Sequence, residues 1–361
     1  MLYLRAFPGE NGPMRSSFRF PLFSILALSG LLTAAASFAA DGFALKDEPG
    51  DHLDVLHDGK IVARYMYASD NSTPARRLDT YKPYLHVFDA EGKEPITKGP
   101  GGDLPHHRAI LVGWNGISVN GKKYDRWHMS GGEQVHEKFL AQTADHDHAT
   151  FTSLVRWTGA AGEPPILMEE RTLTFLPAPA PAYAFIDLTT KIKAVAGDST
   201  LNPDPEHSGL QFRPANEIEK PQTIFVLPGE KANAHKDRDL PWAGESFTLR
   251  GQRFSVVEFN HPINPKPVIF SAYRDYGRFG LTFATSIPAN SEATYRCRFL
   301  VVFGEMPPAE LIQKLSNDYT GASDPVPPIT VNKAEVFKTA APKAPATPAN
   351  STDAPKPAPA K

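Results

Sequence analysis

The sequence predicts a mainly β protein, a large antiparallel β-sandwich with one short C-terminal helix. Three observations lead to this fold class. Short runs rich in β-branched and aromatic residues recur from residue 43 to 305, and Gly, Pro, Asn or Asp bounds most of them. Asn120-Gly121 and Asp58-Gly59 are typical of tight hairpin turns. No helical pattern separates the runs, which favours a sandwich or barrel over alternating strands and helices.

The predicted elements follow from local patterns. A helix is expected over 307–315, where two prolines precede an early carboxylate and apolar residues recur at helical spacing. Cys297, the only cysteine, falls on the apolar side of an alternating strand, so we expect it to fill the core. Strands are predicted over 61–67, 84–88, 109–114, 150–157, 167–175, 184–192, 223–227, 254–259, 268–273, 280–285 and 294–302.

The two ends of the chain differ from its centre. A basic stretch from Met14 to Arg19, an apolar run over 21–36 and the small residues of Ser37-Phe38-Ala39 are typical of a signal peptide. We therefore expect a signal over 1–39, with Met14 as an alternative start, and a periplasmic or secreted protein without a membrane span after cleavage. One sandwich domain is expected over 41–320. Residues 321–361 become rich in Pro and Ala, so a disordered tail is predicted there.

Charge excludes one class of partner. The 38 Lys and Arg residues nearly balance 40 Asp and Glu residues, which gives a net charge of −2. No long basic block is present, so we expect no nucleic-acid partner.

Four sequence blocks carry a resemblance to a known family. They are Tyr81-Lys82-Pro83-Tyr84-Leu85-His86, then Asp103-Leu104-Pro105-His106-His107-Arg108 with Gly113-Trp114 and Val119-Asn120-Gly121, then His207-Ser208-Gly209-Leu210-Gln211-Phe212-Arg213, and finally Pro241-Trp242 through His261-Pro262-Ile263-Asn264-Pro265 to Tyr276-Gly277. In these blocks the chain resembles the secreted bacterial proteins called PmoA-like. Ala109 departs from them, because family members tend to have Gly at that position.

The resemblance implies an exported, β-rich protein from bacteria that degrade complex sugars. It also implies an architecture similar to the large sandwiches of aldose epimerases, which are galactose-mutarotase-like, and of several polysaccharide lyases. The family label echoes a subunit of a membrane methane monooxygenase. That subunit is a bundle of membrane spans, and no later segment of this chain could cross a bilayer, so methane oxidation is a poor interpretation.

Histidine and arginine dominate the predicted catalytic residues. His106, His107 and Arg108 are consecutive, and His207 lies in a loop ahead of Arg213. Histidine titrates near neutrality and can act as a general acid or base. Arginine can hold a carboxylate or polarise a sugar oxygen. For any one histidine alone, a hydrogen-bonded structural role is the commoner fate.

The predicted substrate-binding residues combine aromatic rings with polar side chains. Aromatic faces suit the apolar side of a pyranose ring, whereas His, Asn and Arg read its hydroxyl groups. Packing in the core is the alternative for the tryptophans. The residues assigned to binding are Tyr84, His86, Trp114, Trp127, Arg213, His261 and Asn264.

A second polar cluster contains candidate metal ligands. His128, Glu133 and His136 carry imidazole and carboxylate groups that could ligate zinc or another divalent ion. Their spacing matches no established metal motif, and an exposed polar hairpin is the alternative.

Together these residues predict an exported carbohydrate-active protein. We expect acid–base chemistry of an epimerase, lyase or hydrolase type on a sugar or glycoside. A non-catalytic carbohydrate-binding protein is the first alternative, and a metal-dependent enzyme is the second. The sequence has no Gly-x-Ser-x-Gly elbow and no phosphate-binding loop.

Overall fold

The computed structural model describes residues 41–204 and 206–337. The predicted signal segment over 1–39 and the last 24 residues, 338–361, lie outside the described residues. The described part is mainly β, and all its strands pair antiparallel, as predicted. None of the helices described in it is long and apolar enough to cross a membrane.

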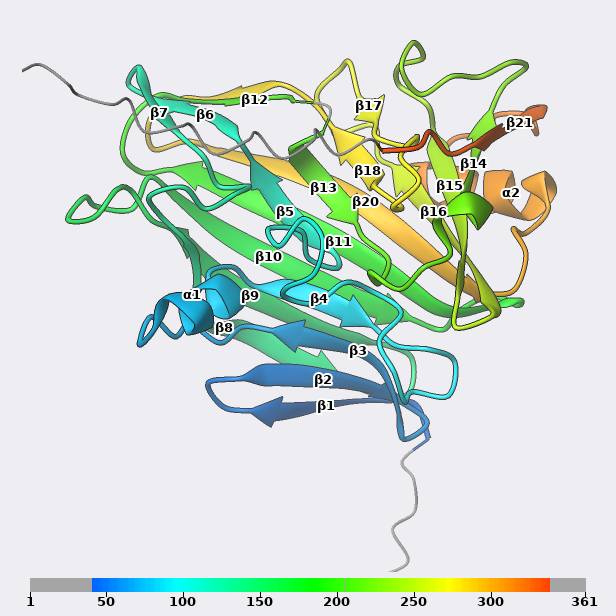
Figure 1. Cartoon of the computed structure of the whole chain (residues 1–361), viewed down its shortest axis with the longest axis horizontal. Helices are drawn as coiled ribbons and strands as arrows, with labels where there is room; N and C mark the ends of the chain where they lie inside the picture. The colour runs from blue at the N-terminus through cyan, green and yellow to red at the C-terminus, as the bar shows by residue number, and fades with distance from the viewer. Residues whose placement is uncertain (1–40, 205, 338–361) are drawn as a thin grey trace, which may run out of the picture. The chain divides into compact units, whose positions relative to one another are not determined.

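One sheet of nine strands forms the first layer of the molecule (Figure 1). Its strand β9 alternates strictly between buried and partly exposed residues, so one face of the sheet lies in the core. Its order is β21 (Ile329–Lys333), β14 (Ile224–Pro228), β15 (Trp242–Leu249), β16 (Gln252–Asn260), β20 (Glu292–Phe303), β11 (Ala182–Ala194), β10 (Leu167–Leu176), β9 (Ala149–Trp157) and β8 (Gln134–Ala144).

Three four-stranded sheets pack over that face as a second layer (Figure 1). The first is β1 (Phe43–Glu48), β2 (His52–His57), β3 (Lys60–Met66) and β4 (Tyr84–Val87). The second is β19 (Thr285–Ile287), β12 (Ser199–Asn202), β6 (Gly116–Val119) and β7 (Lys122–Tyr124). The third is β17 (Ile269–Phe270), β18 (Phe279–Thr282), β13 (Ser208–Phe212) and β5 (Leu111–Trp114).

Side chains from both layers interlock in one core. The Tyr65 hydroxyl on β3 donates to Ser153 Oγ on β9 at 2.9 Å. Trp114 on β5 lies with its ring centroid 6.4 Å from that of Trp157 on β9. Cys297 is fully buried, which confirms its prediction as a core residue. The architecture is therefore the antiparallel sandwich that the sequence predicts.

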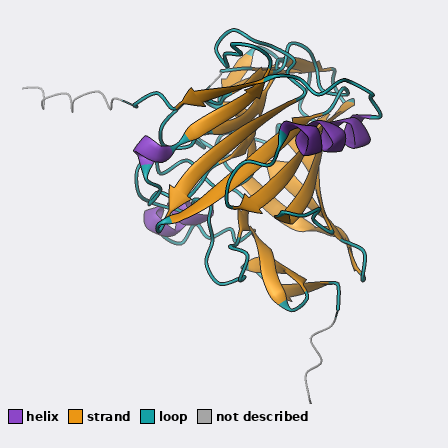
Figure 2. Ribbon diagram, turned by 90° about the vertical axis from the view of Figure 1, so that its right-hand side faces the viewer, coloured by secondary structure: helices purple, strands orange, loops and turns teal. Residues whose placement is uncertain are grey.

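Helix α2 (Ala309–Thr320) covers the other face of the large sheet, as Figure 2 shows from the side. Ile312 and Leu315 pack there, and Trp242 Nε1 donates to Gln313 Oε1 at 3.0 Å. The predicted helix therefore exists, and it continues to Thr320, where Gly321 ends it in the left-handed conformation with φ 73°.

The structure adds elements that the sequence patterns did not reveal. Helix α1 (Pro74–Thr80) starts at Thr73, whose side chain accepts from the Arg76 amide, and a single 3-10 turn, η1, spans Lys220–Gln222. Within the segment predicted as a tail, residues 329–333 form strand β21 and pair with β14. The strands outside the predicted strand ranges are β1, β2, β6, β7, β8, β12, β13, β15, β19 and β21, although the two predicted hairpin turns join β2 to β3 and β6 to β7.

Candidate metal centre

Three histidines from three separate loops converge at one edge of the second layer. His106 precedes β5, His128 follows β7, and His207 immediately precedes β13. One ligand nitrogen of each lies within 4.8 Å of the others. The ring centroid of His128 is 4.4 Å from that of His106 and 4.8 Å from that of His207. All three residues are partly buried.

The end of strand β5 holds two of these loops in place. Trp114 O accepts from the Arg126 amide at 2.8 Å, and the Asn115 amide donates to His207 O at 3.0 Å. Gly113, immediately before Trp114, must be glycine because a Cβ atom there would collide with Arg126 O. The loops that carry His128 and His207 are therefore fixed to the same strand end.

Two of the histidines pair with the aspartate three residues before them, within an Asp-x-x-His motif. Asp125 Oδ1 accepts from the amides of Trp127 at 2.9 Å and His128 at 2.8 Å, while its Oδ2 lies 2.8 Å from His128 Nδ1. Asp204 repeats the arrangement, with Oδ1 accepting from the Glu206 amide at 2.9 Å and Oδ2 at 2.9 Å from His207 Nδ1. Each carboxylate thus occupies Nδ1 and leaves Nε2 available.

This pairing is the arrangement that metal-binding histidines use. A metal-ligating histidine almost always donates its other ring N–H to a carboxylate, carbonyl or water, which fixes the ring and its tautomer. Burial raises the pKa of Asp125 and Asp204, but the hydrogen bonds that each carboxylate accepts, those from His128 and His207 first among them, together outweigh it, so both pKa values fall below the usual one. Both carboxyl groups are therefore ionised at neutral pH.

His106 supplies the third nitrogen in a different way. Its Nε2 is buried and has no hydrogen-bond partner among the described residues. Burial, followed by the charge of His128, lowers the pKa of His106 to about 2, so its imidazole is neutral. A buried ring nitrogen without a partner requires an explanation, and a neutral imidazole is the form that ligates metals.

Lys82 fixes the backbone beneath the cluster. It is 1% exposed, and its Nζ donates to His106 O at 2.9 Å and to Trp127 O at 2.5 Å. Burial places the pKa of Lys82 well below its usual value. The loops of His106 and His128 are therefore joined through one side chain.

The donor set fits a divalent transition metal. Zinc binds imidazole nitrogens at about 2.0–2.1 Å, and catalytic zinc sites use three protein ligands with an open fourth position. Those bond lengths place tetrahedral ligand atoms about 3.3 Å apart. The side chains of His128 and His207 are 33% and 31% exposed, so two of the three ligand side chains border on solvent.

Several predicted site residues lie at or beside this centre. His106, His207 and Trp127 are in it, and His107 adjoins it with its ring centroid 4.4 Å from that of His106. His107 is only 2% exposed, and burial together with the charge of Arg213 places its pKa well below the usual value. Arg213 is also buried, with its Cζ 5.7 Å from the Trp127 ring.

Arg108 has a structural position rather than the catalytic one predicted. Its guanidinium is fully buried, and Nη1 and Nη2 donate to the carbonyls of Pro105, His107 and Leu78 at 2.5–2.7 Å. It therefore fastens the His106 loop to helix α1 and presents no group to a substrate.

Two of the three candidate metal ligands, Glu133 and His136, lie apart from the histidine cluster. Glu133 bonds Arg77 Nε at 2.7 Å, away from the histidine cluster. His136 lies on β8, where its Nδ1 is 2.6 Å from Ser153 Oγ and its ring packs against Phe139. Only His128 belongs to the group that could hold an ion.

The predicted substrate-binding residues other than Trp127 and Arg213 divide among three further places. Tyr84 and His86 line an open cleft of about 430 Å³ over the β3–β4 sheet. Trp114 is fully buried in the core and cannot stack on a sugar. His261 packs against Tyr319 of α2, and Asn264 is buried and donates to Arg296 O at 2.7 Å, so both have structural positions remote from the cleft.

The sequence-based reasoning missed Asp125, Asp204 and the role of Lys82. A signal for the first two exists in the pattern Asp-x-x-His, which occurs at 54–57, 103–106, 125–128, 145–148 and 204–207. The copies at 125–128, 145–148 and 204–207 pair the aspartate with its histidine, but Asp145 and His148 stand on the exposed β8–β9 hairpin.

Comparisons with solved structures return carbohydrate-active and related β proteins. A heparan sulfate lyase from Pedobacter heparinus has 10% identity and a TM-score of 0.34, over 75% of this chain and 36% of the lyase, so the chain spans about a third of that enzyme. A protein from Synechocystis sp. PCC 6803 has 12% identity and a TM-score of 0.36, over 74% of this chain and 98% of its own. A galactose mutarotase related enzyme from Lactobacillus acidophilus has 9% identity and a TM-score of 0.29, over 74% and 100%. These similarities concern the fold alone.

Comparison with curated proteins gave no match. A family model does match, over residues 52–316, and it describes a family of unknown function, DUF6807. The assignment to the PmoA-like family is therefore wrong, because the matching family is a different one. The matched segment covers most of the chain and includes all three histidines of the cluster, so the chain belongs to the family of unknown function DUF6807.

Proposed function

We propose that this protein is a metal-dependent enzyme that acts on a carbohydrate, with a divalent transition metal, zinc first among them, held by His106, His128 and His207. The observation that carries the proposal is the convergence of three ligand nitrogens within 4.8 Å. Two of the rings are oriented by carboxylates, and the third has a buried nitrogen without a partner.

The roles of the protein groups follow from their contacts. The ion would supply Lewis acidity and an activated water at the open position. Asp125 and Asp204 orient His128 and His207, and Lys82 sets the spacing of the His106 and Trp127 backbones. The chemistry thus needs no histidine that titrates near neutrality, in contrast to the general acid or base predicted from the sequence.

The cleft beside the centre supports a carbohydrate substrate. It has a volume of about 430 Å³, within the usual range for small-molecule sites. Its lining includes the charged side chains of Arg64 and Asp79, which suit the hydroxyl groups of a sugar, and the edges of the largely buried rings of Tyr84 and Phe88. Lys82 belongs both to the cleft and to the base of the histidine cluster.

Metal content is the first test. The protein is purified without chelator, and its bound metals are measured by elemental analysis for the wild type, His128→Ala and His207→Ala. We expect about one divalent ion per chain in the wild type. In His128→Ala and His207→Ala the metal content should fall, because removing a ligand should reduce metal affinity by more than the roughly 10–100-fold that loss of a carboxylate behind a ligand costs. His148→Ala is the matched control, because it has the same Asp-x-x-His pairing outside the cluster. Wild-type protein free of metal after zinc dialysis would refute the proposal.

Turnover is the second test. Glycans and glycosides are incubated with the metal-loaded protein, and products are identified by mass spectrometry. We expect a product that disappears with a chelator and returns with zinc. Export, which the N-terminal sequence predicts, stays a prediction and is checked by the N-terminal residue of the protein recovered from its host.

Carbohydrate binding without chemistry is the second candidate function. The open cleft with Tyr84 and His86 favours it, because the cleft could hold a sugar without the metal centre. In that case glycan affinity would survive the chelator and no product would form in a long incubation. Loss of glycan affinity with the metal would instead favour the enzyme.

A further inference from the structure

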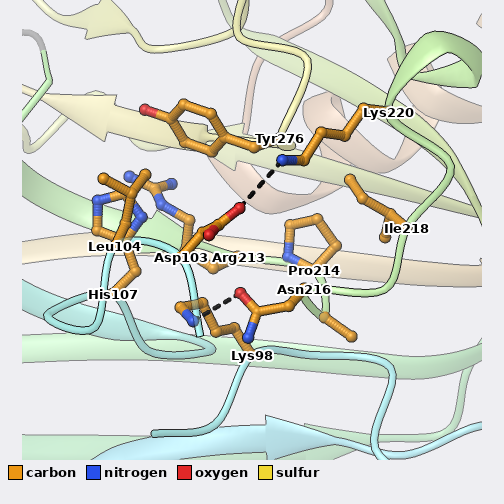
Figure 3. A pocket seen from close by; sticks show the side chains of 11 residues that line it. Lys98, Asp103, Leu104, His107, Arg213, Pro214, Asn216, Ile218, Lys220 and Tyr276 are labelled. Carbon is orange, nitrogen blue, oxygen red and sulfur yellow. Dashed lines mark hydrogen bonds and ion pairs between the residues drawn. The ribbon is translucent and has the colours of Figure 1, made fainter. Parts of the chain in front are cut away.

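The charged residues that line a small cavity beside the metal centre are three cations and one carboxylate. Figure 3 shows Lys98, Arg213 and Lys220 around it, with Asp103 as the one carboxylate. His107 forms part of its wall and joins it to the histidine cluster, since the His107 and His106 rings lie 4.4 Å apart. The charges of these side chains sum to an excess of two positive charges, even with His107 neutral.

Arg213 is the cation with unmet hydrogen-bonding capacity. It is 1% exposed, and Nη1 donates to Phe212 O at 2.7 Å and to Phe279 O at 3.1 Å. Its Nε and Nη2 have no hydrogen-bond partner among the described residues. A buried guanidinium with unmatched donors is costly unless a further group completes it.

Neighbouring charged side chains do not accept from the unpaired donors of Arg213. Arg278, the other buried arginine nearby, has its Nη1 2.9 Å from Glu206 Oε2. Glu245 and Glu258 are fully buried, and burial raises the pKa of both carboxyls well above the usual value, which favours their neutral forms. Neither forms an ion pair with Arg213 within the described ranges.

The size of the cavity restricts what can enter. The cavity has a volume of about 20 Å³, which is enough for one or two water molecules. That is room for the two oxygens of a carboxylate and too little for a sugar ring. Asp103, at the mouth, is 84% exposed and only loosely paired with Lys220 at 3.3 Å.

We propose that this cavity receives the carboxylate of the substrate, so that the substrate is an acidic carbohydrate such as a uronic acid or a uronoside. The inference rests on the proposed function, because it places the anionic group beside the metal centre. Arg213, as a buried cation of the lining, would attract the carboxylate, and Lys220 would add charge at the rim. Asp103 competes for the same cations.

Binding of sugars tests the inference. Isothermal titration at constant ionic strength compares glucuronate with glucose and galacturonate with galactose on metal-loaded protein. We expect at least one uronate to bind about tenfold or more tightly than its neutral parent, as charge-assisted hydrogen bonds allow. Uronates that bind no more tightly than their neutral parents would overturn the proposal.

Two exposed variants test the geometry with opposite signs. Lys220→Met should weaken uronate binding about two- to fivefold, and Asp103→Asn should strengthen it by a similar factor, as expected for rim charges. Lys314→Met, which removes an exposed lysine paired with Asp318 on α2, should change nothing. Rim variants that both weaken binding, or both leave it unchanged, would contradict the assignment.

The two proposals can fail separately. Elemental analysis of the same sample reports the metal, and the uronate preference reports the cavity. Protein without metal that still prefers uronates refutes the metal centre and keeps the anion site. Protein with metal that binds both sugars alike refutes the anion site and keeps the metal centre.

Discussion

Asp204→Asn tests the metal centre without removing a ligand. Asp204 Oδ2 lies 2.9 Å from His207 Nδ1 and accepts from Asn115 Nδ2 at 3.0 Å, while Oδ1 accepts from the Glu206 amide at 2.9 Å. All of these partners are donors when the ring carries its proton on Nδ1. An asparagine has one acceptor oxygen, so its NH₂ group must face a donor whichever way the amide is turned.

The expected cost can be worked out from these contacts. Loss of an outer carboxylate typically reduces metal affinity 10–100-fold, which corresponds to about 1.4–2.7 kcal/mol. His207 is 31% exposed and water can replace part of the lost interaction. We therefore expect the lower part of that range, an affinity for zinc about 10–30-fold weaker than that of the wild type.

A competition titration against a chromophoric zinc chelator measures this difference directly. Melting of the metal-free proteins, followed in parallel, shows whether the loop itself has been destabilised. Asp147→Asn is the matched control, because Asp147 pairs with His146 at 3.0 Å on an exposed hairpin outside the cluster. If Asp204→Asn retained the zinc affinity of the wild type within twofold, the assignment of His207 as an oriented ligand would be refuted.

Three further predictions concern the framework. Burial lowers the pKa of His86 from 6.5 to about 4, so between these values the folded state binds fewer protons than the unfolded state, and the protein loses stability as the pH falls through that window. Between pH 7 and 4, the free energy of unfolding of His86→Gln, measured by urea titration, should therefore fall by up to roughly 3 kcal/mol less than that of the wild type, and identical pH profiles would contradict this. Arg171→Leu leaves the fully buried Glu169 without the cation that lies 2.8 Å away and should lower the free energy of unfolding by about 3–5 kcal/mol. The double variant with Glu169→Gln should lose less stability, and equal losses in the two variants would exclude the ion-pair explanation. Cys297 is fully buried, so a thiol reagent should label it only after denaturation, and rapid labelling of the folded protein would show that the strand opens.

The long strands of the large sheet could be predicted because their signal is local. Strand β9 alternates buried and partly exposed residues over its whole length, and this period of two is visible in the sequence. Strand β7 has three residues, Lys122 to Tyr124, and owes its pairing to β6 rather than to its own composition. Strand β8 is an edge strand with mostly exposed residues, so its apolar pattern is weak.

The candidate site could be predicted only in part, for a related reason. The sequence shows which residues have reactive side chains, but it does not show which of them the fold buries or joins. Arg108 and His106 are two positions apart, yet the fold treats them differently. The guanidinium of Arg108 donates to buried carbonyl groups, whereas Nε2 of His106 has no partner among the described residues. The Asp-x-x-His pairing is local and was available, whereas the approach of His207 to His128 depends on β5 and β13 pairing.

Trp114 illustrates how the core determines the geometry of the site. Its side chain was predicted to stack on sugar, but it is fully buried between the layers, close to Trp157. Its carbonyl holds the Arg126 amide, and the next residue, Asn115, holds His207 O through its amide. The buried indole therefore holds the end of β5 in the sandwich. Two of the three ligand loops are hydrogen-bonded to that strand end. Because that anchor is part of a close-packed core, the ligand spacing is set by the packing of the two layers rather than by the loops themselves.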